Sequence, residues 1–225
     1  MTNKAKCYYC GKEATSREHI PPQSFFPSNQ KLDLVTIPSC EEHNSKKSNK
    51  DEYVRNYITI HRSVKKSGYE KFEEKSRKAF KRNKSLALSV ENAEKATLDG
   101  EETGIFLVKK ANFDEFFDHL ASGIFYFLTN KIFNGKWIIH PISFYEDREL
   151  YEKNVPNVEK IINSYKNIIK NTNLKKIPEF KNEKVFIPQY YKEENNEKIS
   201  IFLNLTFYEG FIVFILGEYD KKDPK

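Results

Sequence analysis

Two pairs of soft metal ligands, each with a spacing of three positions, constrain this chain more than any other feature. The pairs are Cys7 with Cys10, and Cys40 with His43. A turn at each pair brings both side chains to one side, and four such ligands satisfy tetrahedral Zn²⁺. All three cysteines of the chain lie in these pairs, and an odd, clustered count argues against a disulfide framework. The alternative is a thiol redox pair at Cys7 and Cys10, which the second pair disfavours.

Residues 11–39 separate the two pairs, which is a longer insertion than a DNA-reading zinc finger contains. A further structural unit must therefore lie between the two halves of the site. A structural Zn²⁺ would allow this short, loop-rich segment to fold, because metal binding supplies folding free energy. The sequence therefore predicts a zinc-stabilised N-terminal unit that includes the inserted residues.

A second pattern surrounds the ligand pairs. Arg17-Glu18-His19-Ile20-Pro21-Pro22 lies between them, Asn44 directly follows the last ligand, and Asp51-Glu52-Tyr53 comes soon after. Together with the two pairs, this pattern resembles the HNH endonuclease family, which has the ββα-metal fold. The resemblance covers residues 7 to about 55, roughly a quarter of the chain. A similar variant of the family has cysteine where this chain has His43, and histidine is an equally suitable zinc ligand.

The resemblance implies a role for each of three residues. Glu18 corresponds to the carboxylate that holds a catalytic divalent metal, and Asn44 corresponds to the second metal ligand. His19 corresponds to the general base that takes a proton from the attacking water. Mg²⁺ or Mn²⁺ suits such oxygen ligands, and an imidazole that is neutral near pH 7 suits the base. Neighbouring residues of a regular strand point to opposite faces, so the strand must end or bulge here, which Pro21 and Pro22 favour.

One position departs from the family pattern. Asp33 stands seven residues before Cys40, where the family usually has an asparagine that orients the base. A carboxylate could also accept the imidazole N–H of His19, and it would raise the His19 pKa. The alternative is that Asp33 is only a loop residue. Three other histidines have no supporting pattern and receive no function: His61, His119 and His140.

The charge balance leans toward a polyanionic partner. The chain has 38 Lys and Arg against 32 Asp and Glu, a net charge of +6, which helps a protein meet nucleic acid. Asp51 and Glu52 are interpreted as structural, either as helix N-terminal charges or as partners of Arg17 or Arg55. Four residues are weak candidates for phosphate contacts, although a solvated face is the default for such a run: Arg17, Lys46, Lys47 and Lys50.

The chain divides by composition into three stretches. We predict a zinc-bound HNH module at residues 1–58, a charged helical connector at 59–100, and an α+β C-terminal domain at 101–225. The predicted fold class is therefore α+β, with antiparallel strands and two main helices in the larger region. That region would serve specificity, dimerisation or partner binding.

Periodicity places the elements of the larger region. One helix would begin at Asn112 or Asp114 and run through Phe127, and it is apolar around much of its circumference. Such a helix lies either centrally in the domain or in a self-interface, and central burial is favoured. A second helix is expected at 155–169, with Pro156 in its first turn and an apolar face. Strands are expected at 104–108, 137–145, 184–191, 200–207 and 210–216, the last two joined by a hairpin at 208–210.

We therefore predict a metal-dependent endonuclease that hydrolyses phosphodiester bonds in DNA, with RNA not excluded. The resemblance alone suggests a role in bacterial defence or in a mobile element. The alternatives are a zinc-knuckle module that only binds nucleic acid, and an effector subunit that acts once a sensor or activator protein binds. A homodimer is a further option. The sequence has neither an N-terminal secretory pattern nor an apolar run long enough to span a bilayer, which predicts a cytoplasmic protein without membrane contact.

Overall fold

The computed structural model describes residues 5–31, 33–82, 87–88, 91–98, 101–105, 108–145 and 157–222. The chain is α+β, with antiparallel sheets. Its strands are β1 (Ser16–His19), β2 (Thr36–Ser39), β3 (Glu94–Leu98), β4 (Glu101–Ile105), β5 (Trp137–His140), β6 (Lys175–Lys176), β7 (Phe186–Glu194), β8 (Lys198–Phe207) and β9 (Phe211–Asp220). Its α-helices are α1 (Ser48–Thr59), α2 (Lys66–Lys71), α3 (Arg77–Arg82), α5 (Lys110–Thr129) and α7 (Val158–Asn171). Short 3₁₀ turns occupy Gln23–Phe25, Ser28–Gln30, Ser45–Lys47 and Ile142–Tyr145, and a π-helical turn occupies Phe72–Ser76.

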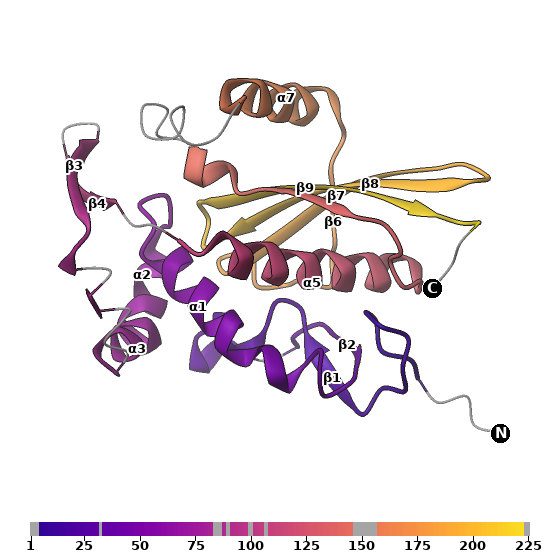
Figure 1. Ribbon diagram of the computed structural model, residues 1–225, viewed down its shortest axis with the longest axis horizontal. Coiled ribbons are helices and arrows are strands. Elements are labelled where there is room, and N and C mark those ends of the chain that lie inside the picture. Colours follow the sequence, from indigo (N-terminus) through magenta and orange to yellow (C-terminus); the bar gives the residue numbers. More distant parts are fainter. Residues whose placement is uncertain are drawn as a thin grey trace.

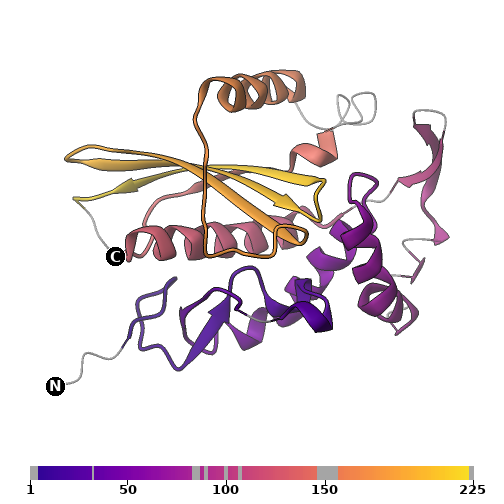
Figure 2. The ribbon, with the colours of Figure 1, turned by 180° about the vertical axis from the view of Figure 1, so that it is seen from behind.

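The C-terminal region is built on a five-stranded antiparallel sheet with strand order β5-β9-β8-β7-β6. Alternation along β8 sends Leu203 and its odd-numbered neighbours to one face and Phe202 to the other. The first face packs on α5, and the second packs on α7, on the opposite side of the sheet (Figures 1 and 2). Both faces of the sheet are therefore covered, which explains why β8 and β9 are apolar nearly throughout.

The predicted hairpin between the last two strands is confirmed. Tyr208 and Glu209 have positive φ angles of 48° and 60°, and the Gly210 N–H donates to the Phe207 carbonyl at 3.1 Å. A Cβ atom on Gly210 would lie 1.6 Å from the Ser63 carbonyl oxygen, so glycine is required by close backbone approach. This contact ties the hairpin to the loop that follows α1.

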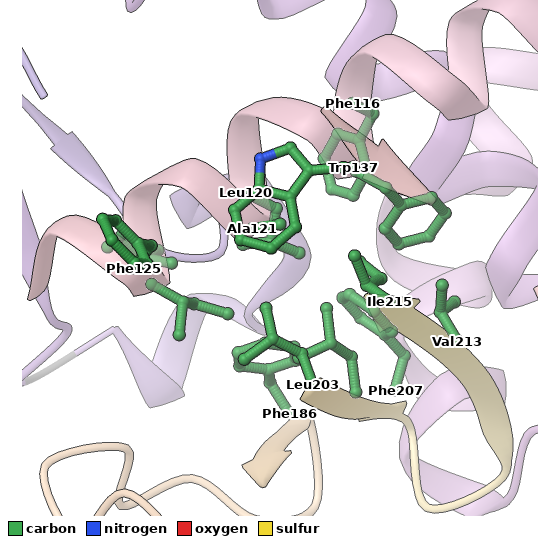
Figure 3. Packing of buried hydrophobic residues seen from close by; sticks show 14 of the residues in the cluster. Phe116, Leu120, Ala121, Phe125, Trp137, Phe186, Leu203, Phe207, Val213 and Ile215 are labelled. Atoms are coloured by element: carbon green, nitrogen blue, oxygen red, sulfur yellow. The ribbon is translucent and has the colours of Figure 1, made fainter. Parts of the chain in front are cut away.

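Helix α5 is the central element of the fold. It lies between the sheet and the N-terminal segment that carries β1, β2 and α1 (Figure 1). Figure 3 shows side chains of α5, among them Phe116, Leu120 and Phe125, meeting those of Trp137 and the sheet strands. The prediction of central burial is confirmed, because Phe117, Ala121 and other residues around the helix are fully buried.

The N-terminal segment shares this hydrophobic core with the sheet. Phe25 is fully buried, and its ring centroid lies 5.6 Å from that of Phe207 in β8. The hairpin of β1 and β2 approaches α5 at Gly123, where a Cβ would meet Ile37 at 3.1 Å and Ile20 at 3.3 Å. The candidate site is therefore built directly against the C-terminal region.

Several predicted boundaries are wrong, for local reasons. Helix α5 begins at Lys110, without a side-chain cap, and not at Asn112 or Asp114. The strand expected at 137–145 ends at His140, because Pro141 has no N–H to extend the ladder. The stretch 59–100, expected to be helical, ends in strand β3, which pairs with β4.

Helix α7 has the expected apolar face. Val158, Ile162 and Tyr165 are among the residues that pack on the sheet from it. The first predicted residues of this helix, 155 and 156, and residues 106–107 of a predicted strand lie outside the described residues. In the part of the chain that the structure describes, no helix is both long and apolar enough to cross a membrane.

Stability should decrease on mild acidification because of His61. Its ring lies 5.1 Å from that of Phe211 and 5.6 Å from that of Phe144, and burial, followed by the charge of Arg62, lowers its pKa to about 4. The unfolded chain takes up this proton below about pH 6.5, while the native state resists it until about pH 4. The neutral His61 therefore contributes its full stabilisation above about pH 6.5. This contribution is lost between about pH 6.5 and about pH 4, at up to about 1.4 kcal/mol per pH unit. Urea unfolding at about pH 7.5 and about pH 5 should show a smaller loss for His61→Gln than for the unsubstituted chain.

Candidate metal centre and active site

The four predicted zinc ligands converge on one point. The ligand atoms of Cys7, Cys10, Cys40 and His43 all lie within 4.8 Å of one another. Cys40 Sγ lies 3.2 Å from His43 Nδ1 and 3.8 Å from Cys10 Sγ. Ligand atoms of a tetrahedral zinc site are spaced by roughly 3.5 Å, so this cluster could hold a metal such as zinc.

Local backbone geometry forms the two halves of the centre. After the first pair, Gly11 has a φ of 74°, and its N–H donates to the Cys7 carbonyl at 3.0 Å. In the second pair, the His43 N–H donates to the Cys40 carbonyl at 3.2 Å. The Tyr8 N–H donates to the Pro38 carbonyl of β2 at 3.0 Å, which joins the halves. Each pair is thus a tight turn, as its spacing predicts.

The thiols differ in acidity before metal binds. Burial raises the pKa of Cys10 to about 11. Burial also opposes ionisation of Cys7, but backbone hydrogen bonds at Cys10, Tyr9 and Cys40 bring its pKa below the ordinary value. Zinc binds thiolates, so metal loading must release protons from this cluster.

The two tyrosines between Cys7 and Cys10 connect the metal centre to α5. The Tyr9 hydroxyl donates to Asp118 Oδ2 at 2.6 Å, and the Tyr8 hydroxyl lies 3.3 Å from His119 Nδ1. The rings of Tyr9, His43 and His119 pack together, with centroid distances of 4.7 Å from Tyr9 to His43, 4.1 Å from Tyr9 to His119 and 5.4 Å between the two imidazoles. The sequence assigned no function to His119, because nothing in its local pattern indicates contact with a motif more than a hundred residues earlier.

Glu18 lies on the inner face of the β1–β2 hairpin. It is opposite Ile37 in the antiparallel register, and it is 6% exposed. Its Oε1 accepts a hydrogen bond from Lys47 Nζ at 2.7 Å, and the same ammonium lies 3.0 Å from Asp51 Oδ2. Burial raises the pKa of both carboxyl groups, and Lys47 opposes that rise. Two carboxylates and one ammonium, each less than a tenth exposed, therefore form a buried triad.

His19 follows Glu18 on the strand and is half-buried. Its pKa is lowered by burial and then by the charge of Lys31, so the imidazole is neutral at pH 7. Among the residues that the structure describes, this imidazole has no hydrogen-bond partner. Beside it on the hairpin, the Arg17 guanidinium donates to the Thr36 hydroxyl at 2.8 Å and to its carbonyl at 2.9 Å. A neutral, unpaired imidazole is chemically suited to accept a proton.

Asn44 fixes the hairpin to the turn that precedes α1. Its side-chain nitrogen donates to Ser16 Oγ at 3.0 Å and to the Arg17 carbonyl at 3.1 Å. These two hydrogen bonds hold Asn44 against β1, the strand that carries Glu18 and His19. The three residues that the resemblance singles out are thus brought into one small region, but with different environments.

The side chains of Glu18 and Asn44, the expected ligands of a divalent metal, both contact protein groups in this structure. The Glu18 carboxylate has the Lys47 ammonium at hydrogen-bond distance, whereas Asn44 contacts the β1–β2 pair through its side-chain nitrogen and not through its oxygen. The cavity bordered by Glu18, His19, Lys47 and His119 has a volume of about 10 Å³, room for about one water. Within the described residues, the one group of three or more His, Cys, Asp or Glu ligands close enough to share an ion is the zinc cluster.

The expected pairing of Asp33 with His19 is corrected. Asp33 has a left-handed backbone with a φ of 55°, its side chain is 74% exposed, and its Oδ2 lies 3.4 Å from Lys181 Nζ. The His19 pKa is shifted downward, the opposite of what a carboxylate partner would produce. Asp33 is a loop residue beside a second cavity of about 470 Å³.

The candidate phosphate-binding residues also differ from one another. Lys47 is 8% exposed, so its predicted place on a solvated basic face is wrong. Lys50 is exposed and ion-paired with Glu115 at 2.5 Å, and Lys46 is exposed. The structural interpretation of Glu52 is confirmed, since its Oε1 lies 3.3 Å from Arg55 Nη2.

Comparisons with protein-family models, with curated proteins and with solved structures found no match for this chain. The assignment of a function therefore depends on the residues and geometry described above.

Proposed function

We propose that this chain is an HNH-type endonuclease that hydrolyses phosphodiester bonds in DNA, with RNA as the alternative substrate. The observation that carries the proposal is the environment of His19. Among the described residues, the neutral His19 imidazole has no hydrogen-bond partner, and it ends strand β1 in the segment that also carries the Cys₃His cluster and α1. The order hairpin, metal ligand, helix is the one that the family resemblance implies.

The proposed reaction uses His19 as a general base. The imidazole accepts a proton from water, the water oxygen forms a bond to phosphorus, and the bond from phosphorus to the leaving oxygen breaks. The leaving oxygen then takes a proton from solvent. Proton transfer of this kind contributes typically about 10²–10⁴-fold to a rate. The resemblance assigns charge stabilisation to Mg²⁺ or Mn²⁺, which Glu18 and Asn44 would hold.

Substrate would approach the outer side of the hairpin. Arg17 on β1 and Lys46 in the turn before α1 are exposed, and the net charge of +6 favours a polyanion. We further propose that the C-terminal region determines specificity, dimerisation or partner binding, with a role in bacterial defence or a mobile element. Zn²⁺ in this proposal is structural.

The first test compares zinc-loaded wild-type protein with His19→Ala on supercoiled plasmid, in the presence of EDTA, Mg²⁺ or Mn²⁺. We expect metal-dependent nicking by the wild type and a loss of about 10²–10⁴-fold in the variant. His140→Ala is the matched control, because His140 is also a partly buried histidine but lies in β5, on the sheet. Equal nicking by wild type and His19→Ala would remove His19 from the reaction.

A second candidate function is favoured by the buried Glu18–Lys47 pair. A zinc-knuckle module that only binds nucleic acid has no need of an accessible carboxylate, and in a subunit that cuts only with a partner this pair would open when the partner binds. Both would bind DNA equally well with and without His19, and neither would cut plasmid alone. Cutting that appears only on addition of a cell extract would identify the partner-gated form.

A further inference from the structure

Lys47 contacts Glu18, the carboxylate that the family resemblance assigns to the catalytic metal. It lies at the end of the 3₁₀ turn Ser45–Lys47, four residues before Asp51, and reaches across to Glu18 on β1. Its Nζ is 2.7 Å from Glu18 Oε1 and 3.0 Å and 3.3 Å from the two Asp51 oxygens. One ammonium therefore bridges carboxylates from two different elements.

Burial prevents a divalent ion and the Lys47 ammonium from lying between Glu18 and Asp51 at the same time. The exposed fractions of Glu18, Lys47 and Asp51 are 6%, 8% and 6%, so water does little to compensate their charges. A divalent ion binds carboxylate oxygens at about 2.0–2.6 Å. An ion at that distance from both carboxylates would overlap or strongly repel the ammonium, whose charge has the same sign. Metal and Lys47 are thus mutually exclusive occupants.

We infer that the Lys47 ammonium is the resident cation between Glu18 and Asp51, and that it excludes Mg²⁺ and Mn²⁺ from Glu18 in the absence of substrate. Its bearing on catalysis rests on the proposed nuclease function. A divalent ion needed for cutting would then bind only together with nucleic acid, whose phosphate oxygens supply ligands and charge. Asp51, interpreted from sequence as a structural acid, belongs to the same site as Glu18.

Manganese binding to zinc-loaded protein tests this inference without reference to cutting. Free Mn²⁺ is followed by its electron paramagnetic resonance signal in titrations of wild type, Lys47→Met and the double variant Lys47→Met/Glu18→Gln. We expect no Glu18-dependent binding by the wild type, one bound Mn²⁺ in Lys47→Met, and loss of that ion in the double variant. Lys46→Met is the matched control, because Lys46 is the exposed neighbour in the same turn.

Thermal unfolding supplies a second readout. Lys47→Met leaves two buried carboxylates without a partner, so its Tm should fall and be restored by Mn²⁺. The double variant should be insensitive to Mn²⁺. Wild-type binding of Mn²⁺ that Glu18→Gln abolishes would overturn the inference, as would a folded Lys47→Met that takes up no Mn²⁺. If Lys47→Met does not fold, the comparison of wild type with Glu18→Gln still decides whether Mn²⁺ binds at Glu18.

Failure of the nuclease proposal is seen separately, as plasmid left intact by a protein whose metal binding follows the expected pattern.

Discussion

Cys40→Ser is expected to lose bound zinc and to unfold the N-terminal segment at the temperature where the wild type is folded. A structural zinc site contributes an apparent binding free energy of about 10–16 kcal/mol at pH 7, and one of its four ligands is lost in this variant. Residues 5–31 and 33–60 contain little regular structure beyond β1, β2, α1 and short 3₁₀ turns, so zinc is a major addition to the apolar packing of this segment. The measurement is zinc content after dialysis, together with the thermal unfolding midpoint.

The controls separate ligand chemistry from general damage. His43→Cys keeps four zinc ligands and should retain both the metal and the fold. Glu42→Ser alters an exposed residue of the same turn and should unfold like the wild type. If Cys40→Ser retains one zinc per chain and a wild-type midpoint, the cluster is not a structural metal site.

The loss is expected to reach beyond the metal centre. Tyr8 and Tyr9 contact His119 and Asp118, so the zinc turns are attached to the helix that also supports the sheet. Trp137, the single tryptophan, donates to Ser122 Oγ of this helix at 2.9 Å. A change in Trp137 fluorescence on zinc removal would show that loss of the metal alters the packing of α5.

The parts of the site that depend on short spacing were predictable from sequence. Two residues between Cys7 and Cys10, and two between Cys40 and His43, are enough to form tight turns, and the turns then bring the pairs together. The strands β8 and β9 and the hairpin at 208–210 were predictable for the same reason, because apolar runs and turn residues are local features of the sequence.

The parts that depend on long-range packing were not predictable. The environment of Glu18 is set by α5, which lies about a hundred residues later and covers the inner face of the hairpin. Without that cover, the sequence gives no reason to expect a buried carboxylate in place of an accessible metal ligand. Lys47 resembles every other lysine of its run, and only its i, i+4 relation to Asp51 could have indicated a partner. The Asp33 side chain likewise faces Lys181, 148 residues later, and no local pattern indicates that contact.

Phe117→Ala is expected to be the most damaging single change away from the metal centre. Phe117 is fully buried in α5, with ring centroids at 5.1 Å from Phe116 and 6.1 Å from Phe207 in β8. Deleting such a ring costs about 3–5 kcal/mol of unfolding free energy, since both apolar burial and packing are lost. That is a large share of the about 5–15 kcal/mol that holds a typical domain folded. Urea unfolding followed by Trp137 fluorescence and by far-ultraviolet circular dichroism measures it.

Phe127→Ala, in the same helix, is the matched control for Phe117→Ala. Phe127 is only partly buried and packs at the edge of the core, with its ring 5.9 Å from that of Phe180. The same atoms are deleted, yet the loss should be clearly smaller, because less apolar surface is exposed and water can fill part of the space. Because α5 contacts both the zinc-bearing segment and the sheet, the two spectroscopic transitions of Phe117→Ala should shift together. Equal losses in the two variants, or transitions that separate, would show that α5 is not the shared centre of the fold.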